Sequence, residues 1–242
     1  MKKFKKLIPA LCMLLVSAVL VGTSTYAWFS MQDQVQVNGL QVTAQTDQKY
    51  LIIGTGDNNS VALLQGLPAK TPAEGNKVDF GMSADDSKVK PVEPKTAVTD
   101  AQNIATVGNW QYKYAENANS STAQAGTEHD LTAFDGYVIV KTVYMTIAKN
   151  TPELSDITAD VTITASEKAT RVILAVTVGS SYKAVQKFDK TETGRSLVTG
   201  TVTDKTLVKV DIYIYVDGED STIYTNNAAN LGTAEINIKF NA

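Results

Sequence analysis

The chain has 242 residues, 43% of them hydrophobic, and a formal net charge of −3. It contains one histidine and one cysteine, which excludes disulfide frameworks and the usual His/Cys metal sites. The composition also excludes a disordered chain, a coiled coil and a polytopic membrane protein, and the small net charge gives no indication of nucleic-acid binding.

Residues 1–27 have the pattern of an export signal. Four lysines at positions 2, 3, 5 and 6 precede an apolar run over residues 7–21. The sequence Thr25-Tyr26-Ala27 predicts cleavage by a signal peptidase between Ala27 and Trp28. The alternative is an uncleaved membrane anchor, but 15 apolar residues in a helix cover only about 22 Å of a ~30 Å hydrocarbon core. We therefore expect contact with the membrane only before cleavage, and a secreted or cell-surface product.

The mature chain, residues 28–242, is expected to form a single domain. Loss of the leader leaves 18 basic and 25 acidic side chains, a formal charge of −7, and removes the only cysteine. An exported domain without disulfides must be stabilised by burial of its sheets, by a metal or by another cross-link.

Alternating apolar and polar residues run through the second half of the chain. The alternation covers residues 157–163, 172–178, 208–216 and 236–240, and residues 137–148 are mostly apolar on both sides. Alternation places every second side chain on one face, so that each strand is half buried. No convincing 3.6-residue apolar period is found. The pattern predicts an all-β fold, an antiparallel two-sheet sandwich with little helix.

Residues 65–131 interrupt this pattern. Four of the six prolines lie here, among many small and polar residues. We expect a long, loop-rich insertion on the surface of the sandwich, with a short helix near residues 100–107 and one strand-like segment over residues 110–114.

The start of the mature chain predicts a strand with one apolar face. Its apolar residues lie at odd positions before Asn38-Gly39 and at even positions after it. These residues are Val35, Val37, Leu40, Val42 and Ala44. A β-bulge at the glycine would keep all five on the core face, because glycine adopts positive φ. A two-residue hairpin turn at Asn38-Gly39 is the alternative.

Two short motifs carry a resemblance to a known family. The sequence Gly-Thr-Ser-Thr-Tyr-Ala-Trp-Phe-Ser at residues 22–30, followed by Gly-Leu-Gln-Val-Thr-Ala at residues 39–44, resembles the start of the TasA/camelysin family. Members have such a junction, cut by a dedicated SipW-type signal peptidase, before a first strand of this form. Residues 214–220 also resemble a signature of exported proteins of Gram-positive bacteria.

The resemblance implies a jelly-roll-like sandwich that is exported to the cell surface or to a biofilm matrix. In that family the subunits form fibres, and each N-terminal strand completes the sheet of the next subunit. The implied partners are a signal peptidase, further copies of the chain and other matrix proteins. Strand addition obtains affinity from main-chain hydrogen bonds and specificity from alternate side chains, here the five apolar residues from Val35 to Ala44. The alternative is an ordinary first strand in its own sheet, and one protein can adopt both states.

The chain is not expected to be an enzyme. Camelysin-like relatives are sometimes classed as metallopeptidases, but the sequence has no His-Glu-x-x-His motif. His129 is the only imidazole for a zinc site that would need three converging ligands. Nucleophile motifs and glycine-rich phosphate loops are also missing from the sequence. A metallopeptidase is therefore the third hypothesis.

One cluster of carboxylates is a candidate cation site. Asp217, Glu219 and Asp220 surround a glycine directly after an apolar strand. Oxygen ligands at a tight turn are typical of Ca²⁺ sites. The alternative is a charged turn that ends an aggregation-prone strand.

One aromatic segment is a candidate binding surface. Trp110, Tyr112 and Tyr114 occupy alternate positions. Such spacing is typical either of an aromatic face that binds sugars or of one packed side of a sheet. The second class of function is therefore a carbohydrate- or host-binding surface module.

Overall fold

The computed structural model describes residues 41–46, 51–67, 76–80, 89–113, 128–165, 169–220 and 234–241. All of them belong to one compact unit, Val35–Ala242. The predicted leader and its cleavage site lie outside the described residues. None of the helices in the described ranges is long and apolar enough to span a membrane.

The first sheet combines strands from near both ends of the chain. Its order is β11 (Glu192–Val202), β8 (Leu154–Ala165), β13 (Ala234–Asn241), β1 (Gln41–Thr46) and β3 (Asn76–Asp79). Neighbouring strands are antiparallel except β1 and β13, which are parallel. This pair differs from the purely antiparallel arrangement that we predicted. Parallel strands cannot be joined by a tight hairpin, and β1 and β13 are the first and last described strands of the chain.

The second sheet is antiparallel throughout. Its order is β10 (Ser181–Phe188), β9 (Thr170–Val178), β12 (Val208–Val216), β7 (Ile139–Ile147) and β2 (Leu51–Gly54). Helix α2 (Val61–Gln65) follows β2 and begins after Ser60, whose hydroxyl accepts from the Leu63 amide. The side chain of Gln65 donates to the carbonyl of Ile147 at 3.0 Å, which holds α2 at the end of β7.

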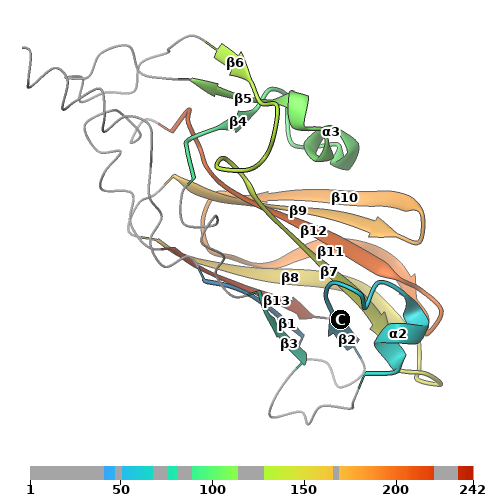
Figure 1. Ribbon diagram of the computed structural model, residues 1–242. Helices are drawn as coiled ribbons and strands as arrows, with labels where there is room; N and C mark the ends of the chain where they lie inside the picture. The colour runs from blue at the N-terminus through green and yellow to red at the C-terminus, as the bar shows by residue number, and fades with distance from the viewer. Residues whose placement is uncertain are drawn as a thin grey trace, which may run out of the picture. The chain divides into compact units, whose positions relative to one another are not determined.

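The two sheets pack face to face over the main hydrophobic core (Figure 1). Most of the residues that alternation predicts to point inwards on the strands β9, β12 and β13 are fully buried, and they include Val172, Leu174, Val176, Val208, Val210, Ile212, Ile236, Ile238 and Phe240. Val178, at the end of β9, is partly buried against the same core. The prediction of a mostly β fold with two packed, largely antiparallel sheets is therefore confirmed.

A third layer covers the outer face of the second sheet (Figure 1). We call it the cap, residues 89–113 and 128–138. Its elements are β4 (Glu93–Pro94), α3 (Ala101–Ala105), the 3₁₀ helix η2 (Val107–Asn109), β5 (Trp110–Lys113) and β6 (Glu128–Asp130). A second hydrophobic core lies between the cap and the sheet, which contributes Ile173, Ala175, Tyr213 and Tyr215.

The described part of residues 65–131 is thus more regular than a loop-rich insertion. The short helix expected near residues 100–107 is α3, whose first turn is capped by the Asp100 carboxylate at 2.8 Å from the Gln102 amide. The cap also explains why Ile173 interrupts the polar face of β9, because that side chain is fully buried in the second core.

Candidate assembly strand

The predicted exchange strand lies in its own sheet. β1 pairs in parallel with β13 over six consecutive positions, from Gln41 opposite Glu235 to Thr46 opposite Phe240. On its other side, residues 43–46 pair antiparallel with β3. Neighbouring strands therefore hold β1 along both of its edges.

Two of the five exchange candidates lie within β1. Ala44 is fully buried in the main core and pairs with Ile238 of β13. Val42 pairs with Ile236. The other predicted residues of this segment lie outside the described residues, and they are Ala27, Trp28, Val35, Val37 and Leu40. The described part of the segment has the place of an ordinary first strand.

The neighbour of β1 is regular enough to accept any strand with the same pattern. β13 keeps one register with β8 over eight pairs and one register with β1 over six. Its inward residues Ile236, Ile238 and Phe240 are fully buried. Without β1, the edge of β13 would present unpaired backbone groups beside this apolar face, which is a template for strand addition.

The first aromatic residue of β5 packs inside the molecule. Trp110 is fully buried in the second core. Its indole Nε1 donates to the carbonyl of Ile104 at 2.9 Å, and its ring meets that of Tyr215 edge to face with centroids 5.1 Å apart. A sugar cannot reach a buried ring, so the position of Trp110 agrees with the packing interpretation.

The second aromatic residue of β5 lies at the margin of that core. Tyr112 is half buried, and its ring stacks between those of His129 at 5.1 Å and Tyr137 at 5.3 Å. Tyr114 lies outside the described residues. Within the ranges that the structure describes, no group of three or more His, Cys, Asp or Glu side chains is placed to hold a metal ion. The imidazole of His129 is an aromatic packing partner of Tyr112.

The carboxylates of the candidate cation site face a guanidinium. Arg171 on β9 is buried, and its Nε lies 3.0 Å from the Asp189 carboxylate and 3.3 Å from that of Asp217. Its Nη2 forms a further ion pair with Asp220. Glu219 is exposed, and its backbone N–H donates to the Asp217 carboxylate at 3.1 Å, as in an Asx turn. The charged-turn interpretation is favoured, because Asp217 and Asp220 already form ion pairs with the Arg171 guanidinium.

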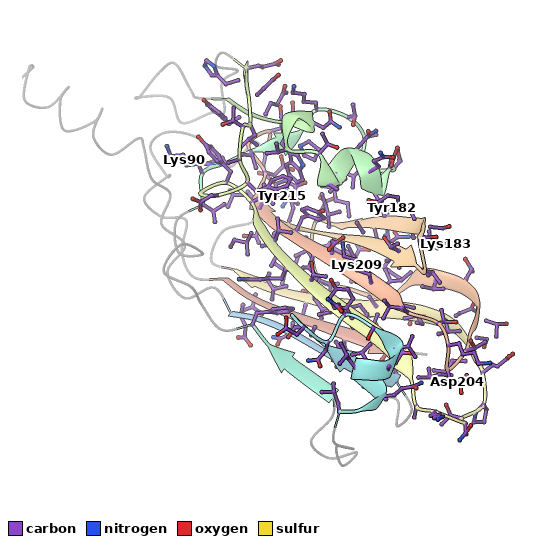
Figure 2. All side chains as sticks on the ribbon, turned by 45° about the vertical axis from the view of Figure 1, so that its right-hand side comes forward. Lys90, Tyr182, Lys183, Asp204, Lys209 and Tyr215 are labelled. Atoms are coloured by element: carbon purple, nitrogen blue, oxygen red, sulfur yellow. The ribbon has the colours of Figure 1, made fainter. Side chains whose placement is uncertain are left out.

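Two tyrosines of β12 lie beneath the cap. Figure 2 shows Tyr215 where the cap meets the second sheet. Burial, and then the nearby Asp217 carboxylate, raises the pKa of Tyr215 far above its usual value of 10.0. Burial, and then Asp211, raises the pKa of Tyr213 in the same direction. Both side chains therefore remain neutral at any ordinary pH, and they serve as aromatic packing groups.

Sequence reasoning did not identify Arg171 or the tyrosine pair. Alternation assigns Arg171, Tyr213 and Tyr215 to the solvent face of their strands, yet all three are buried. The available signal was the presence of large side chains, including Ile173, on a face that should be polar. Such a group indicates that another layer covers the sheet.

Comparison with known proteins gives no relative from which a function can be taken. No family model, curated protein or solved structure matches the chain. The resemblance of residues 22–30 and 39–44 to the TasA/camelysin family therefore stays a prediction from the sequence.

Proposed function

We propose that the chain is an exported, non-catalytic structural or surface-interaction protein whose subunits assemble into matrix fibres by exchanging their N-terminal strands. The observation that carries the proposal is the place of β1, which lies between β13 and β3 and parallel to β13, the last strand in the described residues. The pattern of residues 1–27 supports export to the cell surface or matrix.

A strand in this position can be supplied by a second copy. Residues 47–50 connect β1 in the first sheet to β2 in the second, so β1 forms no hairpin with either of its neighbours. The same backbone pairs form, and Ala44 fills the same place, whichever copy donates the strand. Exchange therefore costs little contact energy. Repeated donation in one direction produces a linear, head-to-tail row of subunits.

Cross-linking of β1 to β13 tests the exchange. Residues 28–242 contain no cysteine, so a variant with Thr43→Cys and Asn237→Cys carries one thiol pair, at facing positions of the two strands. We expect residues 28–242 to form filaments under the electron microscope. Treatment of these filaments with a short bis-maleimide should then yield a ladder of covalent oligomers on a denaturing gel.

The matched control places the thiols in two strands that stay in one subunit. Thr162→Cys and Asn237→Cys face each other across β8 and β13, so this pair should link only within single chains. Filaments in which the Thr43–Asn237 pair also links only within chains would exclude strand exchange. A protein that stays monomeric over a range of pH and salt would exclude the fibre.

The alternative functions have less support from the described residues. A carbohydrate- or host-binding module was predicted from Trp110, Tyr112 and Tyr114, and Trp110 is buried. A persistent monomer of residues 28–242 that retains a glycan would favour this module. A metallopeptidase requires converging ligands, and the described ranges contain no such group.

A further inference from the structure

One side of the sandwich ends in two irregular strands. β10 is an edge strand of the second sheet, and β11 is an edge strand of the first. Residues 189–191 connect the two strands. The pairing of β11 with β8 shifts register three times, and that of β10 with β9 shifts once, between Tyr182 and Ala184. The ladders on either side of β13 show no shift. The irregularity is therefore specific to the β10–β11 side.

Two aspartates of β8 hold the bulges of β11 in place. The Gly194 N–H donates to the Asp160 carboxylate at 2.7 Å, and the Gly200 N–H donates to that of Asp156 at 2.9 Å. Both glycines have positive φ, 67° and 107°, which residues with a Cβ rarely adopt. Asp160 also accepts from the Asn241 side chain of β13 at 2.9 Å. Side chains and glycines of β8, β11 and β13 thus maintain these bulges.

Side chains also join β10 to β11 directly. Gln186 Nε2 donates to the backbone carbonyl of Ser196 at 3.0 Å, and Arg195 Nη2 donates to Gln186 Oε1 at 2.7 Å. Arg195 also pairs with Glu192 at 2.8 Å, and its guanidinium lies 5.6 Å from the ring centre of Phe188. These contacts occupy a backbone acceptor of β11 and place charges along the strand. Both features disfavour pairing with a further strand.

We infer that β10 and β11 form a closed side that does not accept further strands, and that association between copies is confined to the opposite side, where β1 lies beside β3. The identity of the partner as a second copy rests on the proposed strand exchange, whereas the closure of the β10–β11 side rests on its own contacts. Strand addition needs a straight edge with a continuous series of backbone donors and acceptors, and each bulge interrupts that series. Such a subunit grows end to end without adding neighbours laterally.

Replacement of the two aspartates tests the closed side. Asp156→Gly with Asp160→Ala removes both carboxylate acceptors, and glycine is chosen at position 156 because Asp156 has a φ of 58°. Asp156→Asn with Asp160→Asn is the matched control, since it removes the same charges but keeps an oxygen acceptor at each position. We expect the first variant to associate laterally several-fold faster than wild type, by light scattering and by bundling under the electron microscope. The asparagine variant should behave as wild type.

Equal association of the two variants would show that charge, rather than bulge geometry, keeps the side closed, and the inference would be wrong. Unchanged association of a correctly folded Gly/Ala variant would also contradict it. Circular dichroism and the melting temperature establish that each variant is folded. Lateral association can be measured on monomers as well as on filaments. The test of the closed side therefore remains valid even if the protein forms no fibres.

Thiol labelling gives a second readout that does not depend on removing the aspartates. Thr199→Cys replaces an exposed residue of β11, and Lys77→Cys lies on β3 opposite Gln45, on the face of the sheet opposite to the buried Ala44. In filaments, we expect Thr199→Cys to keep the maleimide labelling rate of the free subunit and Lys77→Cys to label several-fold more slowly. Protection of Thr199→Cys would place the β10–β11 side in the contact and overturn the inference.

Discussion

At the scale of single residues, Tyr215 shows what the cap does to a side chain on the face of a sheet. It is 1% exposed, and its ring packs edge to face on Trp110. Its hydroxyl is buried with no hydrogen-bond partner among the residues described. An unpaired buried hydroxyl costs free energy, so the stabilising part of this residue is its ring.

Tyr215→Phe is expected to leave the stability at neutral pH unchanged or to raise it by about 1 kcal/mol, because it removes the unpaired hydroxyl and keeps the ring. Above pH 10 the unfolded chain ionises this tyrosine while the folded chain does not, because burial raises the pKa in the folded state. Each such tyrosine therefore lowers the free energy of unfolding by about 1.4 kcal/mol per pH unit above pH 10. Urea unfolding across this range should show a shallower alkaline loss for Tyr215→Phe, and identical slopes would contradict the assignment.

At the scale of elements, Arg171 joins three segments that sequence order separates. It lies on β9, and its guanidinium pairs with Asp189, directly after β10, and with Asp217 and Asp220, directly after β12. The side chains of Arg171, Asp217 and Asp220 are 10%, 14% and 16% exposed. The network therefore fixes the ends of neighbouring strands at the margin of the cap.

Arg171→Met should destabilise the fold by about 3 kcal/mol, because it removes the guanidinium from the largely buried carboxylates of Asp217 and Asp220, and the Lys187 ammonium, 3.6 Å from Asp217, replaces only part of that charge. Arg195→Met is the matched control. Arg195 also pairs with a carboxylate, but its side chain is 41% exposed, so its loss should cost no more than about 1 kcal/mol. Denaturant unfolding of both variants measures the difference. Equal losses of unfolding free energy would show that the Arg171 network contributes no more to stability than an exposed ion pair.

At the scale of the whole molecule, the cap and the second sheet share one hydrophobic core. Trp110 lies at the centre of that contact, with Phe134 and Tyr213 at centroid distances of 5.9 and 6.3 Å as well as Tyr215. The second sheet is therefore apolar on both faces near this contact, with the main core on one side and the cap on the other.

Trp110→Ala is expected to cost about 3–5 kcal/mol of stability, because it removes a fully buried side chain from the contact between the layers. Hydrogen exchange should locate the loss in the cap, with faster exchange of the amides of β5 and β6 and retained protection of β12 and β13. Tyr182→Ala serves as the control. Its side chain is 51% exposed, so the change should stay within about 0.5 kcal/mol. A loss of protection spread evenly over the sandwich would contradict a separately opening cap.

Much of the sandwich was predictable from local pattern. Val208, Val210 and Ile212 were assigned to the core face because the two-residue period is a property of the strand itself. The candidate site was harder to predict from the sequence. Trp110 has the same spacing on a sugar-binding face and in a packed core, and only Ile104, Phe134 and Tyr213 around it distinguish the two. Likewise, Asp217 and Asp220 have the spacing of a cation site, and Arg171, far away in sequence, changes that interpretation.

The sequence by itself determined the strands over residues 157–163, 172–178, 208–216 and 236–240 and which face of each points to the main core, whereas β10 and β11 were not predicted. Only the tertiary structure decided that β1 lies parallel to β13, that residues 89–113 and 128–138 cover the second sheet, and that the β10–β11 side is irregular. The physical reason is the range of the interactions. Alternation arises from the geometry of one strand, whereas strand partners, covering layers and ion pairs depend on residues that meet only after the chain has folded.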